Sequence, residues 1–195
     1  FSASYGGEPA IAAYACIAYM ICIIYLIFQG VGDGSQPLIS RCYGEQDFAR
    51  MRGFRRLAYG FAILLAVIGC ILLYVTRDSL GLLFGASQEV NIEVAEIIPI
   101  FLVSVPFVAV TRVTTASFYA SEKSALSYVL TFVEPVLMLV LMLLLPPLLG
   151  GQVMIWWSTV FARILSAVLA LALKSYVDRH DRLLHPSRGQ TVSAC

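Results

Sequence analysis

Long apolar runs alternate with shorter polar segments along most of this 195-residue chain. Because an α-helix rises 1.5 Å per residue, about 20 apolar residues are enough to cross a hydrocarbon core of about 30 Å. Five runs reach roughly that length with few charges inside them. The pattern predicts an all-α, polytopic membrane helix bundle over 1–174, followed by a polar tail over 175–195. Its five transmembrane helices are expected at about 10–40, 57–76, 97–121, 124–147 and 152–174.

The composition agrees with a membrane protein and excludes an ordinary soluble domain. Hydrophobic residues make up 59% of the chain and charged residues 13%, whereas soluble domains carry about 25% charged residues. Mean hydropathy is +0.84. The net charge of +1 gives no reason to expect nucleic acid as a partner, because membrane topology explains where the basic residues lie. The partner that the composition indicates is membrane lipid.

Lys and Arg residues concentrate in alternate connections between the predicted helices. Arg77 is the one basic residue in the other connections, and two more lie inside the predicted helices. Because cytoplasmic loops are enriched in Lys and Arg, we expect a multi-pass protein of the cell membrane with residue 1 outside and the C-terminus in the cytoplasm. The basic residues on the expected cytoplasmic side are Arg41, Arg50, Arg52, Arg55, Arg56, Lys123, Lys174, Arg179, Arg182 and Arg188.

Two of the connections between the predicted helices are long. In 41–56, basic residues alternate with Phe48, Met51 and Phe54, a pattern typical of a segment that lies along the membrane surface. Residues 77–96 form the longest expected outer connection, and its charges are mostly acidic.

Prolines and glycines interrupt three of the predicted helices. Pro37, Pro106 and Pro135 are expected to kink their helices, because proline lacks the backbone N–H that the helix ladder uses. Three glycines between 30 and 34 either weaken the first helix or let another backbone approach it closely.

Three ionisable residues, Arg112, Glu134 and Arg163, lie in the middle of predicted transmembrane helices. Arg112 precedes the hinge at Lys123 by as many residues as Glu134 follows it, so both lie about 16 Å from the hinge. Arg163 and Glu134 are likewise almost equidistant from the turn near 149. All three charges therefore fall at a similar depth, and we hypothesise that Glu134 bridges Arg112 and Arg163 inside the bundle.

This predicted ion network has two interpretations. In one, it only holds three helices together; in the other, it lines a polar cavity whose hydration or protonation changes during transport. Charges inside a membrane need partners or water in either case. Asp33 and Gln36 are further candidates for the cavity. Asp33 could instead be a helix-end carboxylate that reaches the interface, and Gln36 could instead bond between helices.

The chain gives little support for an enzyme, a metal site or a bound cofactor. It has no Walker loop, no G-x-S-x-G, no H-E-x-x-H and no paired Cys and His set. His180 and His185 lie in the polar tail without further ligand types at metal spacing. The five cysteines have no paired spacing and are interpreted as small apolar residues of the helices.

The stretch 29–44, QGVGDGSQPLISRCYG, resembles the signature of multidrug and toxic compound extrusion (MATE) transporters. The matching residues are Gln29, Gly30, Asp33, Gly34, Gln36, Pro37, Tyr43 and Gly44. The later layout is similar as well, with a small and aromatic helix end at 117–120, a glycine turn at 150–151 and a helix that bears Trp156 and Trp157.

The resemblance implies a fold of twelve helices in two lobes, of which this chain would hold about helices eight to twelve. Because it begins with Phe1, we expect a C-terminal lobe fragment or a truncated reading frame, whose partner is the N-terminal lobe of the same protein. The implied function is secondary antiport, which exports small organic, often cationic, compounds in exchange for Na⁺ or H⁺.

The family's cation site does not carry over to this lobe. In some members acidic residues of helix seven and of the helix matching 97–120 bind the coupling ion, but that helix here carries Arg112 and no acid. Coupling would then rest in the N-terminal lobe or on Glu134 and Asp33. Two other functions stay open: a flippase for lipid-linked sugars of related architecture, and a truncated membrane partner that does not transport.

Overall fold

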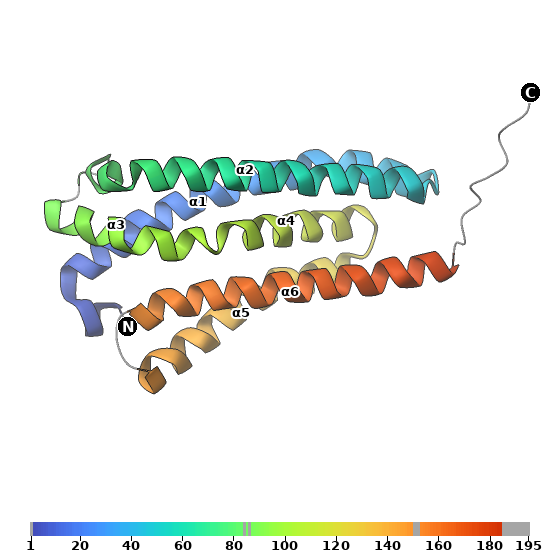
Figure 1. Cartoon of the computed structure of the whole chain (residues 1–195). Helices are drawn as coiled ribbons and strands as arrows, with labels where there is room; N and C mark the ends of the chain where they lie inside the picture. Colours follow the sequence, from blue (N-terminus) through green and yellow to red (C-terminus); the bar gives the residue numbers. More distant parts are fainter. Residues whose placement is uncertain (1, 84, 86, 150–152, 185–195) are drawn as a thin grey trace, which may run out of the picture.

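The computed structural model describes residues 2–83, 85, 87–149 and 153–184, and this part of the chain is helical without a β-strand. The helices run side by side in an elongated bundle (Figure 1). The prediction of an all-α helix bundle is therefore confirmed. The helices are α1 (Ser2–Gly44), α2 (Phe48–Leu83), α3 (Gln88–Leu102), α4 (Val105–Ala120), α5 (Ser124–Leu149) and α6 (Val153–Leu184).

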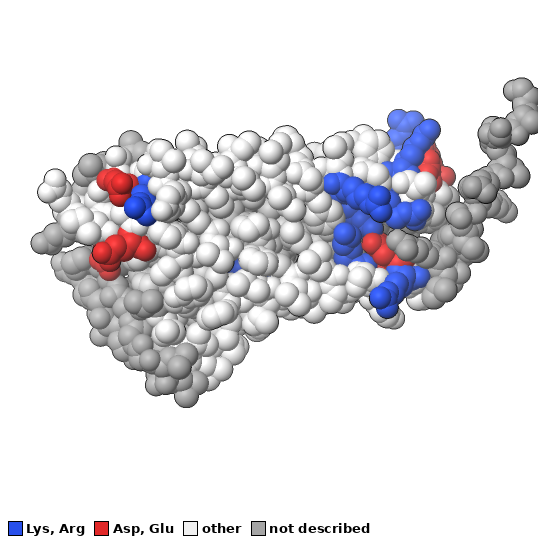
Figure 2. Space-filling model, viewed as in Figure 1, with Lys and Arg blue, Asp and Glu red and all other residues white. Residues whose placement is uncertain are grey.

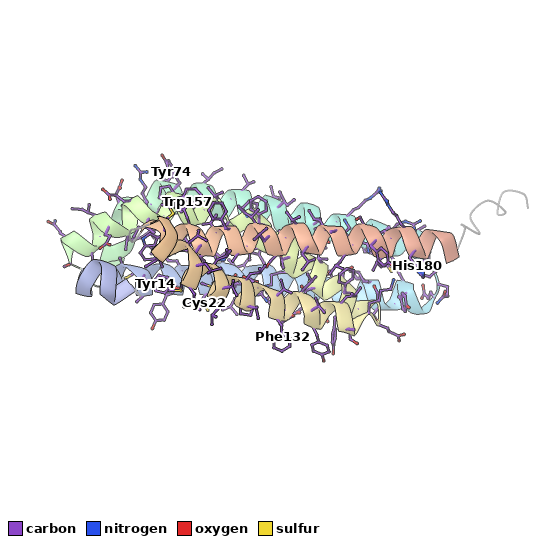
Figure 3. All side chains as sticks on the ribbon, turned by 90° about the horizontal axis from the view of Figure 1, so that it is seen from below. Tyr14, Cys22, Tyr74, Phe132, Trp157 and His180 are labelled. Carbon is purple, nitrogen blue, oxygen red and sulfur yellow. The ribbon has the colours of Figure 1, made fainter. Side chains whose placement is uncertain are left out.

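The helices are long enough, and the outer surface of the bundle is apolar enough, for a membrane protein. Four apolar stretches are long enough to span a bilayer, namely Ala12–Gly44, Phe48–Gly81, Ser124–Leu145 and Met154–His180, and the bent pair α3 and α4 makes a fifth span when it is counted as one. Large apolar side chains cover the outside, as Phe132 shows by pointing away from α5 (Figure 3). Such a surface is stable in lipid and unstable in water.

Helices extend beyond the expected spans, and one prediction about a connection is wrong. The segment 41–56 is no surface segment: it contains the end of α1, a turn at 45–47 and the start of α2. Most of 77–96 is also helical, because α2 runs to Leu83 and α3 begins at Gln88. Good helix formers continue the spans into the polar region. The break between α1 and α2 lies where Gln46 adopts a φ of 58° and Asp47 caps α2 by accepting from the backbone N–H of Arg50 (3.0 Å).

The third predicted span is broken between α3 and α4, which meet at an angle of 51°. Pro106 in the first turn of α4 has no N–H for the carbonyl of Leu102, so the ladder cannot continue across this point. Ser104 occupies the break, and its hydroxyl donates to the carbonyl of Phe101 (2.7 Å). The other two prolines differ, since α1 continues through Pro37 and α5 through Pro135.

Helix α4 lies at the centre and packs against α1, α2, α5 and α6. Its buried positions are mostly small, for example Ala109 and Ala116, and membrane helices pack closely through such residues. Gly32 of α1 lies directly opposite: a Cβ added there would sit 3.0 Å from the Cβ of Ala116. The glycine run thus lets α1 approach α4 at Gly32, whereas Gly30 and Gly34 have open space around them.

Basic residues gather at one end of the bundle, which we call the basic end (Figure 2). Arg55 of α2 pairs there with Asp178 of α6 (2.5 Å), although its side chain is only 6% exposed. The ammonium of Lys174 lies 4.4 Å from the ring centre of Tyr59, whose hydroxyl bonds Thr114 of α4 (2.6 Å). These contacts tie α2, α4 and α6 together at the basic end.

Replacing Asp178 by Asn should lower the free energy of unfolding of the full-length protein by about 3 kcal/mol, because it leaves the buried charge of Arg55 without its counter-ion. The matched control is Glu45→Gln, which breaks the exposed pair with Arg41 and should cost less than about 1 kcal/mol. Thermal unfolding in detergent measures both. Equal shifts for the two variants would show that burial of Arg55 contributes nothing.

Candidate functional site

The three charges predicted at one depth meet inside the bundle. Glu134 of α5 lies between the two arginines, with its Oε2 3.8 Å from Arg112 Nη2 and its Oε1 3.9 Å from Arg163 Nε. The tight turn at 121–123 reverses the chain between α4 and α5, so equal counts on either side bring Arg112 and Glu134 together. The hypothesised ion bridge is thus present in the structure.

Tyr25 and Ser104 complete this group, and neither was expected from the sequence. The Tyr25 hydroxyl donates to Glu134 Oε1, and its ring lies 4.5 Å from the guanidinium of Arg112 and 5.4 Å from that of Arg163. Arg163 Nη1 donates to Ser104 Oγ (2.9 Å), which connects it to the break between α3 and α4. We call Tyr25, Ser104, Arg112, Glu134 and Arg163 the central cluster.

The central cluster joins helices that pack little on each other. Helix α1 packs on α2, α3 and α4, whereas α5 packs on α4 and α6. The bond from Tyr25 to Glu134 therefore reaches from α1 to α5 over Arg112 of α4. A change at Glu134 would act on four helices and on the break at Ser104 at once.

Asp33 and Gln36 form a separate polar group on α1. The side-chain amides of Gln29 and Gln36 both donate to Asp33 Oδ1, at 2.9 and 3.0 Å. Asp33 and Gln29 are exposed, and the hydrogen bonds described for these three side chains stay within the group. We call Gln29, Asp33 and Gln36 the polar edge of α1. At 3.6 residues per turn they share an arc of about 80° with Tyr25, so the polar edge leads from the central cluster toward the basic end.

The threonine hydroxyls of α4 form hydrogen bonds within their own helix. The hydroxyls of Thr111, Thr114 and Thr115 bond carbonyls one turn earlier in α4. Among the described residues, no three His, Cys, Asp or Glu side chains lie together as metal ligands would. A hollow of about 510 Å³ lies at the end opposite the basic end, where Arg77 and Glu96 line it, and it is separate from the central cluster.

Ionisable side chains at these positions suit transport across the membrane better than enzymatic catalysis. Ionisable groups within membrane spans mark ion and substrate paths, because each is costly in hydrocarbon without a partner or water. Glu134 and Asp33 are carboxylates that can exchange a proton or hold a cation, whereas the two arginines cannot lose their charge.

The comparisons with known proteins agree with this inference. The model of the family MatE matches residues 1–145, which include all of α1 to α4 and most of α5. Of the central cluster, Arg163 alone lies beyond the matched residues. The comparisons with curated proteins and with solved structures each gave no match. The chain is a membrane protein of the MatE family, whose members are transporters and not enzymes.

Proposed function

We propose that this chain supplies half of the transport path of a secondary antiporter, which exports small organic, often cationic, compounds in exchange for Na⁺ or H⁺. The observation that carries the proposal is the partly buried central cluster, with the polar edge of α1 continuing from it. The basic end is then cytoplasmic, and the opposite end of the bundle is on the outer side, as the Lys and Arg distribution favours.

The polar edge supports a water-filled path. Asp33 and Gln29 are exposed, although they lie within the apolar stretch Ala12–Gly44. A carboxylate facing lipid at that depth costs at least about 2.5 kcal/mol. We therefore place this edge against the path between the two lobes, where the N-terminal lobe is the partner and water or substrate contacts Asp33.

Coupling follows from what a cation does to Glu134. A proton or Na⁺ at this carboxylate weakens its attraction for Arg112 and Arg163 and competes with the Tyr25 hydroxyl. The side-chain link from α1 to α5 through Tyr25 and Glu134 is then weaker, and the break between α3 and α4 provides a place to bend. Alternating access would use this change as the lobe rocks against its partner.

Transport by the full-length protein in proteoliposomes tests the proposal, with ethidium as the organic cation. Uptake should follow an imposed H⁺ or Na⁺ gradient and stop when the gradient is dissipated. Asp33→Asn should reduce gradient-driven uptake about tenfold, because the path loses an exchangeable carboxylate. Asp78→Asn, at an exposed site outside the path, is the matched control and should change little. Ethidium movement that ignores both gradients would refute antiport.

A flippase for lipid-linked sugars is the second candidate function. One observation favours it: the central cluster holds two arginines and one carboxylate, which suits an anionic substrate better than a cationic one. Transfer of a fluorescent lipid-linked sugar between the leaflets of the same proteoliposomes, without dependence on H⁺ or Na⁺, would favour the flippase over the antiporter.

A further inference from the structure

The charges of the central cluster do not balance. Arg112 and Arg163 carry two positive charges, and Glu134 is the one described carboxylate that pairs with them. The side chains of Glu134 and Arg163 are 17% and 8% exposed and that of Arg112 is 29% exposed, so most of the excess charge lies out of contact with water. An uncompensated charge at this depth is unfavourable unless an anion joins it.

Donor atoms of both arginines also lack a hydrogen-bond partner. Four buried side-chain atoms in the described residues make no hydrogen bond, and two of them are the Nε atoms of Arg112 and Arg163. The Glu134 oxygens, at 3.8 and 3.9 Å, are too far for the bond that a paired carboxylate makes near 2.8 Å. Guanidinium groups only donate, so the missing partner must be an acceptor.

Aromatic rings lie against the same guanidinium groups. The ring of Tyr25 lies beside both arginines, and the ring of Phe101 lies 5.9 Å from the guanidinium of Arg163. The ring of Trp156 packs against that of Phe101 in an edge-to-face arrangement, with the ring centres 5.8 Å apart. A ligand that reaches the two arginines would therefore place its remaining atoms against apolar, aromatic surface.

We propose that Arg112 and Arg163 bind the oxyanion of an amphipathic organic anion, a carboxylate or phosphate carried on an apolar body. Glu134 holds the two arginines when the ligand is absent and competes with it for them. This proposal deepens the proposed function by adding an anionic substrate class to its often cationic compounds, and it rests on that function only for the claim that the bound anion is also transported. The source of the oxyanion is either a soluble organic acid or a lipid headgroup.

Binding to the full-length protein in nanodiscs of neutral lipid tests the site. The probes are 2-naphthoate and its uncharged analogue 2-naphthamide, which differ in charge and hardly in shape. Naphthoate should bind about tenfold or more tightly, because charge-assisted hydrogen bonds to guanidinium are strong. Arg112→Gln should remove that preference and Glu134→Gln should increase it, whereas Arg77→Gln at the opposite end should leave it unchanged.

Equal affinity for the two probes would overturn the proposal, as would a preference that survives Arg112→Gln. If that variant does not fold, Arg112→Lys replaces it: the charge stays, the planar donor pair is lost, and the preference should fall severalfold.

Nanodiscs with phosphatidylglycerol distinguish the source of the oxyanion, since competition with naphthoate identifies a lipid headgroup and no competition identifies a soluble acid. Binding without transport would contradict the proposed function alone, and ethidium transport without a preference for naphthoate would contradict this inference alone.

Discussion

Glu134→Gln in the full-length protein is expected to abolish gradient-driven transport while the protein still folds. The amide keeps the shape and can still accept from the Tyr25 hydroxyl, but it can neither exchange a proton nor neutralise the arginines. We expect uptake to fall at least about tenfold, as for loss of an essential buried charge. Ethidium uptake in proteoliposomes measures the loss, and thermal unfolding of the same sample measures stability.

The geometry explains why folding should survive this change. The ion pairs of Glu134 are longer than hydrogen bonds, and the Arg112 side chain is 29% exposed. Arg163 is buried, but it keeps its hydrogen bond to Ser104 (2.9 Å), so the variant should be less stable and still fold. Glu45→Gln, which removes an exposed carboxylate at the basic end, is the control and should transport normally. An unfolded Glu134→Gln protein would show instead that the cluster only holds the helices together.

Gly32→Leu is expected to destabilise the bundle by about 1–3 kcal/mol and to stop transport, because it overpacks the contact between α1 and α4. A Cβ added at this position would lie 3.0 Å from the Cβ of Ala116 and 3.6 Å from the carbonyl oxygen of Arg112. A longer side chain must push α1 away from α4. Tyr25, two turns earlier on α1, would then lose its place in the central cluster.

A size series separates this effect from loss of glycine itself. Gly32→Ala should be mild, because a small shift of Ala116 accommodates one methyl group. Gly60→Leu on α2 has nothing within 4 Å of the added Cβ and should be neutral or slightly stabilising, since leucine favours helix by up to about 1 kcal/mol over glycine. Melting temperatures that do not differ between Gly32→Leu and Gly60→Leu would mean that close approach of α1 to α4 is unimportant.

The sequence was sufficient to predict the features that depend on the length of an apolar run or on the number of residues between two positions. Apolar runs of helical length predicted the membrane helices, and equal spacing about Lys123 predicted the meeting of Arg112 and Glu134. The surface segment over 41–56 was wrong, because alternating basic and apolar residues there also fit the last turns of α1 and the first of α2. The break near Pro106 was expected only as a kink, because a proline inside a helical run is compatible with either a kink or a break.

The partner of Glu134 on α1 could not be predicted from the sequence. Tyr25 and Glu134 are separated by 109 positions, and no local pattern connects them. One signal was available: Tyr25 precedes Gln29 by one helical turn, so it lies on the same face as the residues of the polar edge. Which of the glycines between 30 and 34 packs on α4 also required the structure, because only the helix rotation decides that Gly32 faces Ala116.

Water accessibility of the polar edge tests the central claim most directly. In full-length protein with the native cysteines replaced, Asp33→Cys and Phe61→Cys place single thiols on α1 and α2 at similar distances from the turn at 45–47. A charged, water-soluble methanethiosulfonate reagent should modify the thiol at 33 and leave that at 61, on the apolar outer face of α2, unmodified. If the thiol at 33 is as unreactive as that at 61, the polar edge faces no water and the proposed path is wrong.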